Sequence, residues 1–427
     1  MMIYKFPYQW APTIEVPERN LIGIFKPSRV TSNRDQKKVI EEGLSNPIGS
    51  QSLSQMVKKG QKILILVDDI SRPTPVSIIL PHILNELRQA GIQKEDIKFL
   101  IALGTHRKMT EEEMIIKLGR KVYEDYKVIN HDCRDPNCFY HAGFTRGNTE
   151  ILVNKEIHNA DFVIGVGNIV PHPAAGFGGG GKIVNPGVVS EETCGEFHWE
   201  SVQYPQEQIL GRRDNPIMKM IDEVAERAGL KFIVNTILDS KGDIVHLVAG
   251  HPKEAHKVGC KFSIKVHGVK IPEKADIVIA DSHPADLEMW QAIKGLCTCE
   301  LVLSDGGIVI FLTPCPEGVS KMHPELLKYG YRNLEQTTRL LEEGKVNKVV
   351  AHHMVQGGRL LDKAETVYVI SPGLKDQEIK KLGFTPATSP RVALESALNK
   401  LGKNASIIIL ESAAELFPIV GKSRAME

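Results

Sequence analysis

Two hydrophobic patterns alternate along the chain. Short runs of consecutive apolar residues, typical of buried strands, are followed by segments whose apolar residues recur at helical spacing. The helical segment that follows the second strand opens with a capping box, Thr110 and Glu113. In the first half, the strand-like runs are KILILVDD (62–69), IKFLIALG (97–104) and DFVIGVGN (161–168), and the helical segments are 75–91 and 110–119. This alternation predicts βαβ units around a parallel sheet.

A second series of strands and helices begins near residue 270. Its strand-like runs are 275–282, 306–314, 365–372 and 405–412, and its helical segments are 284–295, 334–344 and 389–402. Before it, residues 231–250 predict an antiparallel hairpin across a turn at Ser240–Asp243. A connection rich in Gly, Pro and Lys (266–276) marks the boundary. We therefore predict an α/β fold of two α/β domains, residues 1–269 and 270–427, with the active site in the cleft between them.

Composition narrows the classes of function. The 427 residues are 42% apolar and 25% charged, as in a soluble globular protein, and a net charge of +1 predicts no nucleic-acid partner. The apolar runs are too short to span a bilayer, and the N-terminal MMIYKFPYQW lacks the pattern of a signal peptide. Seven cysteines without a zinc-knuckle spacing predict reduced, structural thiols. We expect a cytoplasmic protein with no membrane partner.

Four consecutive glycines, Gly178, Gly179, Gly180 and Gly181, run directly into Lys182. Together with Gly176 they match G-x-x-x-x-G-K, the phosphate-binding loop of nucleotide hydrolases. The match fails at position 183, where Ile offers no hydroxyl for magnesium, and Pro186 prevents a helix from starting on the lysine and continuing. The glycines still indicate close approach of the backbone to a ligand.

Residues with catalytic chemistry gather just after the predicted strands, where ligands bind in α/β domains. They are Asp69 and Arg72, His106, His172 and Lys182, then His198 and, in the second domain, Gln291 and Lys294. Two histidines suit a base and an acid on opposite faces of one substrate. An Arg with a Lys suits a carboxylate, and a third His suits a metal. This set points to a small carboxylic acid undergoing reversible proton or hydride chemistry.

These residues lie in motifs that resemble the lactate racemase family of nickel-dependent 2-hydroxyacid racemases and epimerases. The motifs are DDISRPTP (68–75), LGTHR (103–107), VGNIVPHPAAGFGGGGKIVNPG (166–187), FHW (197–199) and WQAIKG (290–295). They occur in the family's order across nearly the whole chain. Each motif alone is weak, but the set is specific.

The resemblance implies a role for each residue. The family's cofactor is a nickel pincer nucleotide, a pyridinium mononucleotide with sulfur ligands, and Lys182 matches its covalent attachment site, with the glycines and Asp69 beside it. His198 matches the nickel ligand, and His106 and His172 match the acid–base pair. Arg72 and Lys294 match the residues that hold the substrate carboxylate, and Gln291 matches one near the substrate oxygen. Trp290, directly before Gln291, is a further candidate for substrate binding. The first domain would then bind cofactor, and the second would contact substrate.

The implied reaction inverts C2 of a 2-hydroxy acid. One histidine removes the hydroxyl proton, hydride moves from C2 to the cofactor, and a 2-keto acid intermediate receives it back on its other face. Enzymes that make the cofactor are implied as partners. Trp290 stands where lactate enzymes have Tyr, and the region 349–358 (VVAHHMVQGG) lacks their late tryptophan. We therefore predict a substrate other than lactate, with His352 and His353 either near the pocket or solvated at a helix end.

Four alternatives remain open at this point. The first is a lactate racemase proper. The others are a P-loop-like nucleotide-binding protein, a zinc hydrolase built from the histidines, and a non-catalytic carrier or sensor of the cofactor. The zinc hydrolase is disfavoured because the chain has no H-E-x-x-H motif. The carrier is disfavoured because a protein that only carries the cofactor does not need the acid–base pair His106 and His172.

Overall fold

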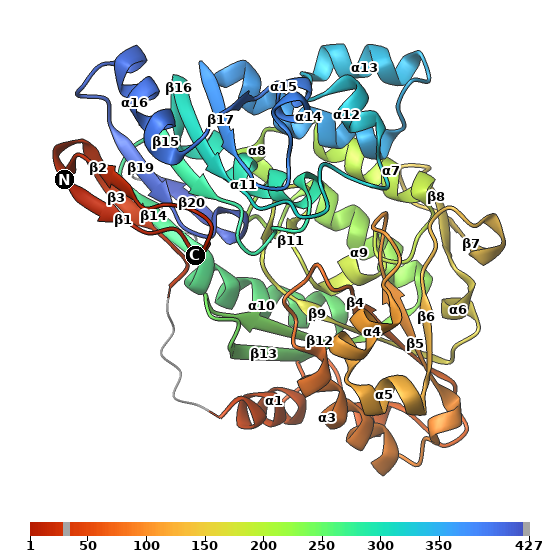
Figure 1. Cartoon of the computed structure of the whole chain (residues 1–427). Coiled ribbons are helices and arrows are strands. Elements are labelled where there is room, and N and C mark those ends of the chain that lie inside the picture. The colour runs from red at the N-terminus through yellow and green to blue at the C-terminus, as the bar shows by residue number, and fades with distance from the viewer. Residues whose placement is uncertain (29–34, 422–427) are drawn as a thin grey trace. The chain divides into compact units, whose positions relative to one another are not determined.

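The computed structural model describes residues 1–28 and 35–421, and the chain forms two compact units (Figure 1). We call the one formed by Arg29–Ser201 and Gly211–Val266 the glycine-loop unit. The C-terminal unit is formed by Met1–Ser28, Val202–Leu210 and His267–Glu427. None of the helices in the described ranges is long and apolar enough to cross a membrane.

A six-stranded sheet in the order β13-β12-β9-β4-β5-β6 forms the centre of the glycine-loop unit. All neighbours are parallel except β12 and β13, which form the predicted antiparallel hairpin. The strands of the sheet are β4 (Ile63–Asp68), β5 (Ile97–Ala102), β6 (Lys127–Asn130), β9 (Phe162–Asn168), β12 (Leu230–Leu238) and β13 (Ile244–Gly250). The chain winds outward from β4 in one direction through β5 and β6, and then in the other from β9. Strands β4 and β9 therefore flank the topological switch point, where ligands bind in open α/β sheets.

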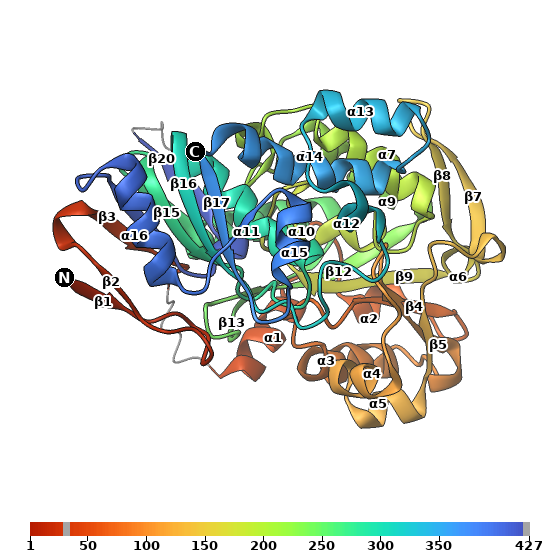
Figure 2. The same cartoon turned by 45° about the horizontal axis from the view of Figure 1, so that its top comes forward.

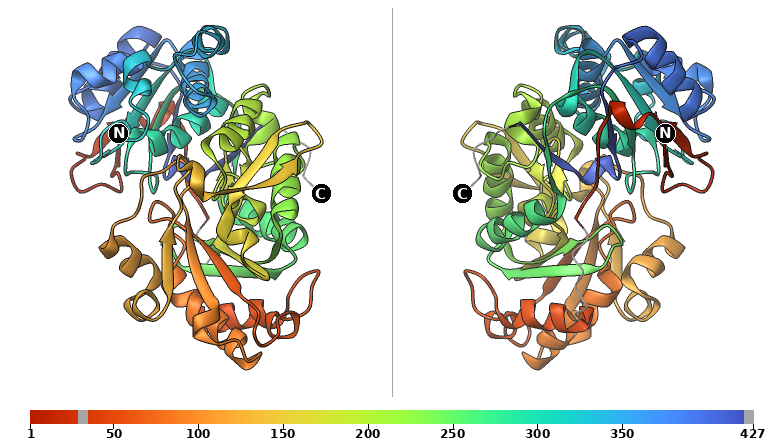
Figure 3. Two further views of the ribbon diagram at one scale, coloured as in Figure 1. Left: turned by 90° about the vertical axis from the view of Figure 1, so that its right-hand side faces the viewer. Right: turned by 90° about the vertical axis from the view of Figure 1, so that its left-hand side faces the viewer.

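Helices cover both faces of this sheet, as Figures 1 and 3 show. Apolar side chains of α1 and α3 form one core with alternate residues of the central strands. The opposite face carries the glycine loop and α9, and Ile183 packs over Gly165 of β9. The helices of the unit are α1 (Gln36–Ser45), α2 (Leu53–Met56), α3 (Val76–Gln89), α4 (Glu111–Leu118), α5 (Arg120–Asp125), α6 (Lys155–His158), α7 (Glu191–Ser201), α9 (Pro216–Ala228) and α10 (Pro252–His267). Short hairpins pair β7 (Phe139–Phe144) with β8 (Glu150–Asn154) and β10 (Pro171–His172) with β11 (Gly176–Phe177).

The C-terminal unit has its own parallel sheet, in the order β18-β17-β16-β15-β19-β3 (Figure 2). Its strands are β3 (Leu21–Phe25), β15 (Ala275–Asp281), β16 (Leu303–Leu312), β17 (Thr366–Ile370), β18 (Thr385–Pro386) and β19 (Ile407–Leu410). Its helices are α8 (Gln206–Ile209), α11 (Met289–Val302), α12 (Glu325–Tyr329), α13 (Leu334–Glu342), α14 (Lys348–Lys363), α15 (Asp376–Leu382) and α16 (Pro390–Leu401). The pairs β1 (Met2–Tyr4) with β2 (Ile14–Val16) and β14 (Gly268–Ile271) with β20 (Phe417–Val420) complete it.

Long-range pairing makes both units discontinuous in sequence. The predicted boundary at residues 269/270 lies close to the last passage between units, at 266/267. However, residues 1–28 pack with the C-terminal unit, because β3 is hydrogen-bonded to β19 and β1–β2 covers the core of that sheet. Residues 202–210 also belong there, because the guanidinium of Arg359 donates to the carbonyls of Val202 and Tyr204.

Candidate active site

The carboxyl ends of three neighbouring strands, β9, β4 and β5, supply most of the predicted site residues in the glycine-loop unit. Asp69 follows β4 directly, and its Oδ2 lies 2.7 Å from Nδ1 of His106, which follows β5. The amide of Ser71 donates to Oδ1 of Asp69 at 2.6 Å. Burial alone would raise the pKa of Asp69, but the charges of His106 and Arg72 outweigh it and hold that pKa well below its usual range. An ionised Asp69 fixes a proton on Nδ1 of His106, so the neutral ring carries its basic lone pair on Nε2.

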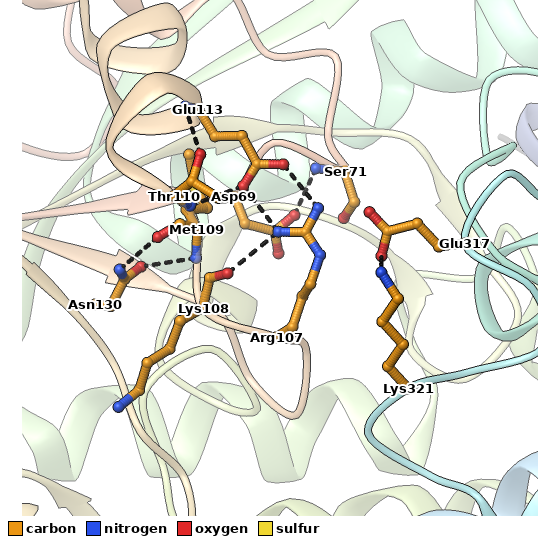
Figure 4. Close-up of polar contacts among 10 residues, drawn as sticks. All are labelled: Asp69, Ser71, Arg107, Lys108, Met109, Thr110, Glu113, Asn130, Glu317 and Lys321. Carbon is orange, nitrogen blue, oxygen red and sulfur yellow. Dashed lines mark hydrogen bonds and ion pairs between the residues drawn. The ribbon is translucent and has the colours of Figure 1, made fainter.

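The segment after His106 is tied to its own unit on two sides, as Figure 4 shows. The guanidinium of Arg107 donates to both carboxylate oxygens of Glu113, at 2.8 and 2.7 Å, and Glu113 also closes the capping box with Thr110. The hydrogen bond from Arg107 lowers the pKa of Glu113. On the other side, Met109 exchanges backbone hydrogen bonds with the side-chain amide of Asn130. The turn that follows His106 is therefore held to its own unit by hydrogen bonds on both sides.

His172 has the opposite hydrogen-bond pattern to His106. It lies in the β10–β11 hairpin, and its Nδ1 accepts from the backbone amide of Ala174 at 3.2 Å. A neutral ring that accepts at Nδ1 carries its proton on Nε2. The two histidines are thus held as complementary tautomers, one with a basic Nε2 and one with a donating Nε2.

The glycine run is packed against its own unit so tightly that side chains are excluded. A Cβ on Gly180, whose φ is +59°, would lie 2.6 Å from the ring of His256, and one on Gly181 would lie 2.9 Å from Ala225 of α9. The amide of Gly180 donates to Oδ1 of Asn235, and Nε2 of His256 lies 2.8 Å from the carbonyl of Gly178. Burial lowers the pKa of His256 to about 3, so this ring is neutral and donates to that carbonyl. Close approach to protein thus explains glycines that the sequence assigned only to ligand approach.

Lys182 follows as part of a 3₁₀ turn, Gly180–Ile183, and the next helix, α7, begins only at Glu191. A phosphate-binding loop of a nucleotide hydrolase would open an α-helix here, so that alternative is wrong. Burial, and then the charge of Arg72, lowers the pKa of Lys182 to about 7. An amine with that pKa is largely unprotonated just above neutrality and is a competent nucleophile.

His198 lies on α7, one turn after Cys194. Its Nδ1 is 3.1 Å from the sulfur of Cys194, which is fully buried. Burial raises the pKa of Cys194 well above its usual value, so this thiol stays protonated. A metal-binding imidazole is normally oriented through its second nitrogen, as Cys194 orients Nδ1 of His198 here. Within residues 1–28 and 35–421, no group of three or more His, Cys, Asp and Glu could hold a metal ion.

The three remaining predicted residues lie on α11 of the C-terminal unit. The ammonium of Lys294 donates to Oε1 of Gln291 at 2.7 Å, one turn apart on the helix. Trp290 is only 8% exposed, because its ring is stacked between His323 and His353 at centroid distances of 3.9 and 3.8 Å.

His352 and His353 are buried within α14, at 5% and 3% exposure, so the reading of them as solvated helix-end residues is wrong. The sequence pattern also gave no sign of the stacking between His353 and Trp290. A helix of this length was not predicted there, because adjacent glycines, Gly357 and Gly358, weaken the helical signal.

Models of two protein families match the chain. The model described as lactate racemase N-terminal domain matches residues 9–209, and the one described as lactate racemase C-terminal domain matches residues 271–416. The lactate racemase of Thermoanaerobacterium thermosaccharolyticum is 32% identical over 313 residues, which cover 71% of this chain and 72% of that protein. The lactate racemase of Lactiplantibacillus plantarum is 31% identical over 324 residues, 74% of this chain and 76% of that protein.

Solved structures show the same architecture. The apoprotein of the T. thermosaccharolyticum lactate racemase superimposes with a TM-score of 0.87 at 27% identity, covering 98% of this chain and all of that one. A Thermotoga maritima protein superimposes with a TM-score of 0.73 at 21% identity, covering 90% of this chain and 98% of that one, which shows the fold alone.

Proposed function

The chain belongs to the lactate racemase family, and from this premise we propose that it is a racemase or epimerase that inverts C2 of a 2-hydroxy carboxylic acid. The observation that carries the proposal is the complementary hydrogen bonding of His106 and His172. Inversion of either enantiomer needs one group that takes the hydroxyl proton and another that returns a proton. Asp69 presents a basic Nε2 on His106, and the amide of Ala174 presents a donating Nε2 on His172.

The residues of the glycine-loop unit fit the family's nickel pincer nucleotide. Lys182 would form the covalent attachment, and its pKa of about 7 leaves a useful fraction of free amine near neutral pH. His198 would ligate nickel through Nε2, with Nδ1 held by Cys194. Asp69 and the glycines Gly178, Gly179, Gly180 and Gly181 would lie on the cofactor side. When bound, the cofactor supplies a hydride acceptor, so that the acid passes through its 2-keto form.

The chain's own residues then bind, orient and move protons. Arg72 would bind the substrate carboxylate through its planar fork, and Lys294 stays a predicted substrate residue on the strength of the family resemblance. Gln291 accepts from Lys294, which fixes the orientation of its amide. His106 takes the hydroxyl proton of one enantiomer at Nε2 and becomes an imidazolium beside Asp69. His172 returns a proton from its own imidazolium form, which it reaches by protonation at Nδ1 with loss of the contact from the Ala174 amide, and proton exchange with water resets both rings.

We further propose that the substrate is a 2-hydroxy monocarboxylate or sugar acid other than lactate, because Trp290 stacks on imidazoles and the chain lacks the late tryptophan of lactate enzymes. A lactate racemase proper is the second candidate, favoured by the names of both curated relatives. The retained acid–base pair argues against a mere carrier of the cofactor.

Holoprotein made in a cofactor-producing host tests the proposal. Single enantiomers of several 2-hydroxyacids are incubated with it in D₂O, and the products are resolved by chiral chromatography and mass spectrometry. We expect racemisation with the C2 hydrogen retained, because a hydride held by the cofactor does not exchange with solvent. Complete deuterium incorporation at C2 would instead indicate carbanion chemistry, and no racemisation of any acid would refute the proposed function.

A further inference from the structure

Lys117 of α4 is buried where a lysine is rarely found. Its side chain is 3% exposed, and its ammonium lies 2.8 Å from Oδ1 of Asp68. The same ammonium donates to the backbone carbonyl of Arg72 at 2.8 Å. Lysines are almost never fully buried unless they are paired. Lys117 is therefore held in place by one carboxylate and one carbonyl, which lie at the end of β4 and in the short loop that follows it.

That loop, residues 68–74, is closed by hydrogen bonds on each side of the ammonium. The hydroxyl of Thr74 donates to Oδ2 of Asp68, which joins the end of the loop to its start. Inside it, the amide of Arg72 donates to the carbonyl of Asp69 at 3.1 Å, and the amide of Ser71 donates to the Asp69 side chain. Lys117 spans the loop from Asp68 to Arg72, and so fixes the two ends of the turn that carries Asp69.

We propose that Lys117 is a positioning residue of the active site, which acts by holding the loop that presents Asp69 to His106 and Arg72 to the substrate carboxylate. The part that concerns substrate rests on the proposed function, but the part that concerns the loop does not. A merely structural ion pair can be replaced by neutral groups with little loss. The carbonyl of Arg72 cannot be satisfied in that way, since it still lacks a donor when both charges are removed.

This difference gives the test. Lys117→Met leaves Asp68 as an unpaired buried carboxyl, whereas Lys117→Met with Asp68→Asn removes both charges and keeps an acceptor for Thr74. Lys121→Met, an exposed lysine on α5, is the matched control. Urea unfolding gives global stability, and amide hydrogen exchange at Ser71 and Arg72 reports opening of the loop in apoprotein, with no cofactor or substrate needed.

We expect both Lys117 variants to exchange the Ser71 and Arg72 amides about tenfold faster or more, the size of one hydrogen bond to a charged group. We also expect the double variant to recover most of the global stability lost by the single one. In holoprotein the double variant should have a raised KM with its nickel and adduct retained. If the double variant recovers loop protection together with stability, or if protection never changes, Lys117 is a structural residue only. A wild-type enzyme that racemises nothing would count against the proposed function and leave the exchange result standing.

Discussion

The indole of Trp290 and the imidazole of His353 are stacked almost parallel, with ring centroids 3.8 Å apart and an interplanar angle of 5°. Nε2 of His353 also lies 2.9 Å from the carbonyl of Trp290, so the two residues are joined by a hydrogen bond as well as by the stack. Burial lowers the pKa of His353 to about 3, and the ring is therefore neutral. Within the described residues its Nδ1 has no hydrogen-bond partner. A polar acceptor thus lies beside the tryptophan that precedes Gln291.

The substrate prediction follows from this pair. We expect kcat/KM on one holoprotein preparation to be higher for a longer or hydroxylated acid than for lactate, across lactate, 2-hydroxybutyrate, malate, phenyllactate and gluconate. A difference of about one methylene between substrates changes the free energy of discrimination by roughly 1–3 kcal/mol. A hydroxyl that satisfies a buried hydrogen-bond acceptor changes it by more. His353→Phe keeps an aromatic stack on Trp290 and removes the buried Nδ1, and a changed preference in this variant would show that this acceptor reaches the substrate. Lactate as the best substrate would show the pocket argument to be wrong while leaving the family unchanged.

Asp69→Asn should leave the fold intact and reduce kcat by roughly 10⁴-fold, because an amide no longer fixes the tautomer of His106, by analogy with the equivalent change in a Ser-His-Asp triad. Asp132→Asn is the control, since the ion pair of Asp132 is with Lys108, whose side chain is 61% exposed. Steady-state kinetics with urea unfolding separates a catalytic effect from a loss of stability. Equal losses of kcat in the two variants would contradict the role given to Asp69.

His198→Ala should lose or loosen nickel, whereas His106→Ala and His172→Ala should keep it and lose racemisation. The reason is the difference in surroundings: His198 is oriented by a thiol on its own helix, while the other two are oriented by an ionised carboxylate and by an amide. Elemental analysis of each purified holoprotein, beside its activity, measures this. Full nickel content in the His198 variant would remove that residue from the ligand set.

The sequence was sufficient for features set by local patterns. The hairpin β12–β13 and the capping box of α4 are confirmed, because turn and capping chemistry depend on a few neighbouring residues. The helix predicted at 284–295 begins later, and α11 runs from Met289 to Val302. The pattern could not show that β3 joins the second sheet, since pairing across nearly 400 residues leaves no local signal.

The residues of the candidate site could likewise be predicted only in part. Residues that stand just after strands were found, because strand ends are visible as the ends of apolar runs. Their supporting partners were missed: Lys117 lies one turn after Met114 in what reads as an ordinary amphipathic helix, and Cys194 was assigned a structural role. The role of each depends on which atom it contacts in the folded chain, the carbonyl of Arg72 for Lys117 and Nδ1 of His198 for Cys194. Composition and spacing do not show such contacts. The glycines Gly357 and Gly358 concealed α14 for a packing reason, since a Cβ on Gly358 would lie 1.9 Å from the carbonyl oxygen of Arg332.

Lys182 gives the last prediction, in two measurements. Intact-mass spectrometry of holoprotein should show a cofactor adduct that Lys182→Ala loses and that Lys219→Ala, a change at a 70% exposed lysine in the same unit, retains. An adduct of unchanged mass on the Lys182 variant would contradict the attachment site. The second measurement uses apoprotein and the pKa. Because the folded pKa of Lys182 is lowered from 10.5 to about 7, the unfolded chain binds more protons between those values.

This difference in bound protons sets the direction in which pH changes the stability of the fold. Wherever the unfolded state binds more protons, stability rises with pH, at most by about 1.4 kcal/mol per pH unit for one group. Lys182→Met removes the buried ammonium and should therefore be more stable than wild type at pH 7, with the difference shrinking steadily toward pH 10. Urea unfolding of the two apoproteins at several pH values between 7 and 10 measures this difference. A constant difference across that range would show that Lys182 keeps an ordinary pKa, and the nucleophilic amine proposed for cofactor attachment would lose its physical basis.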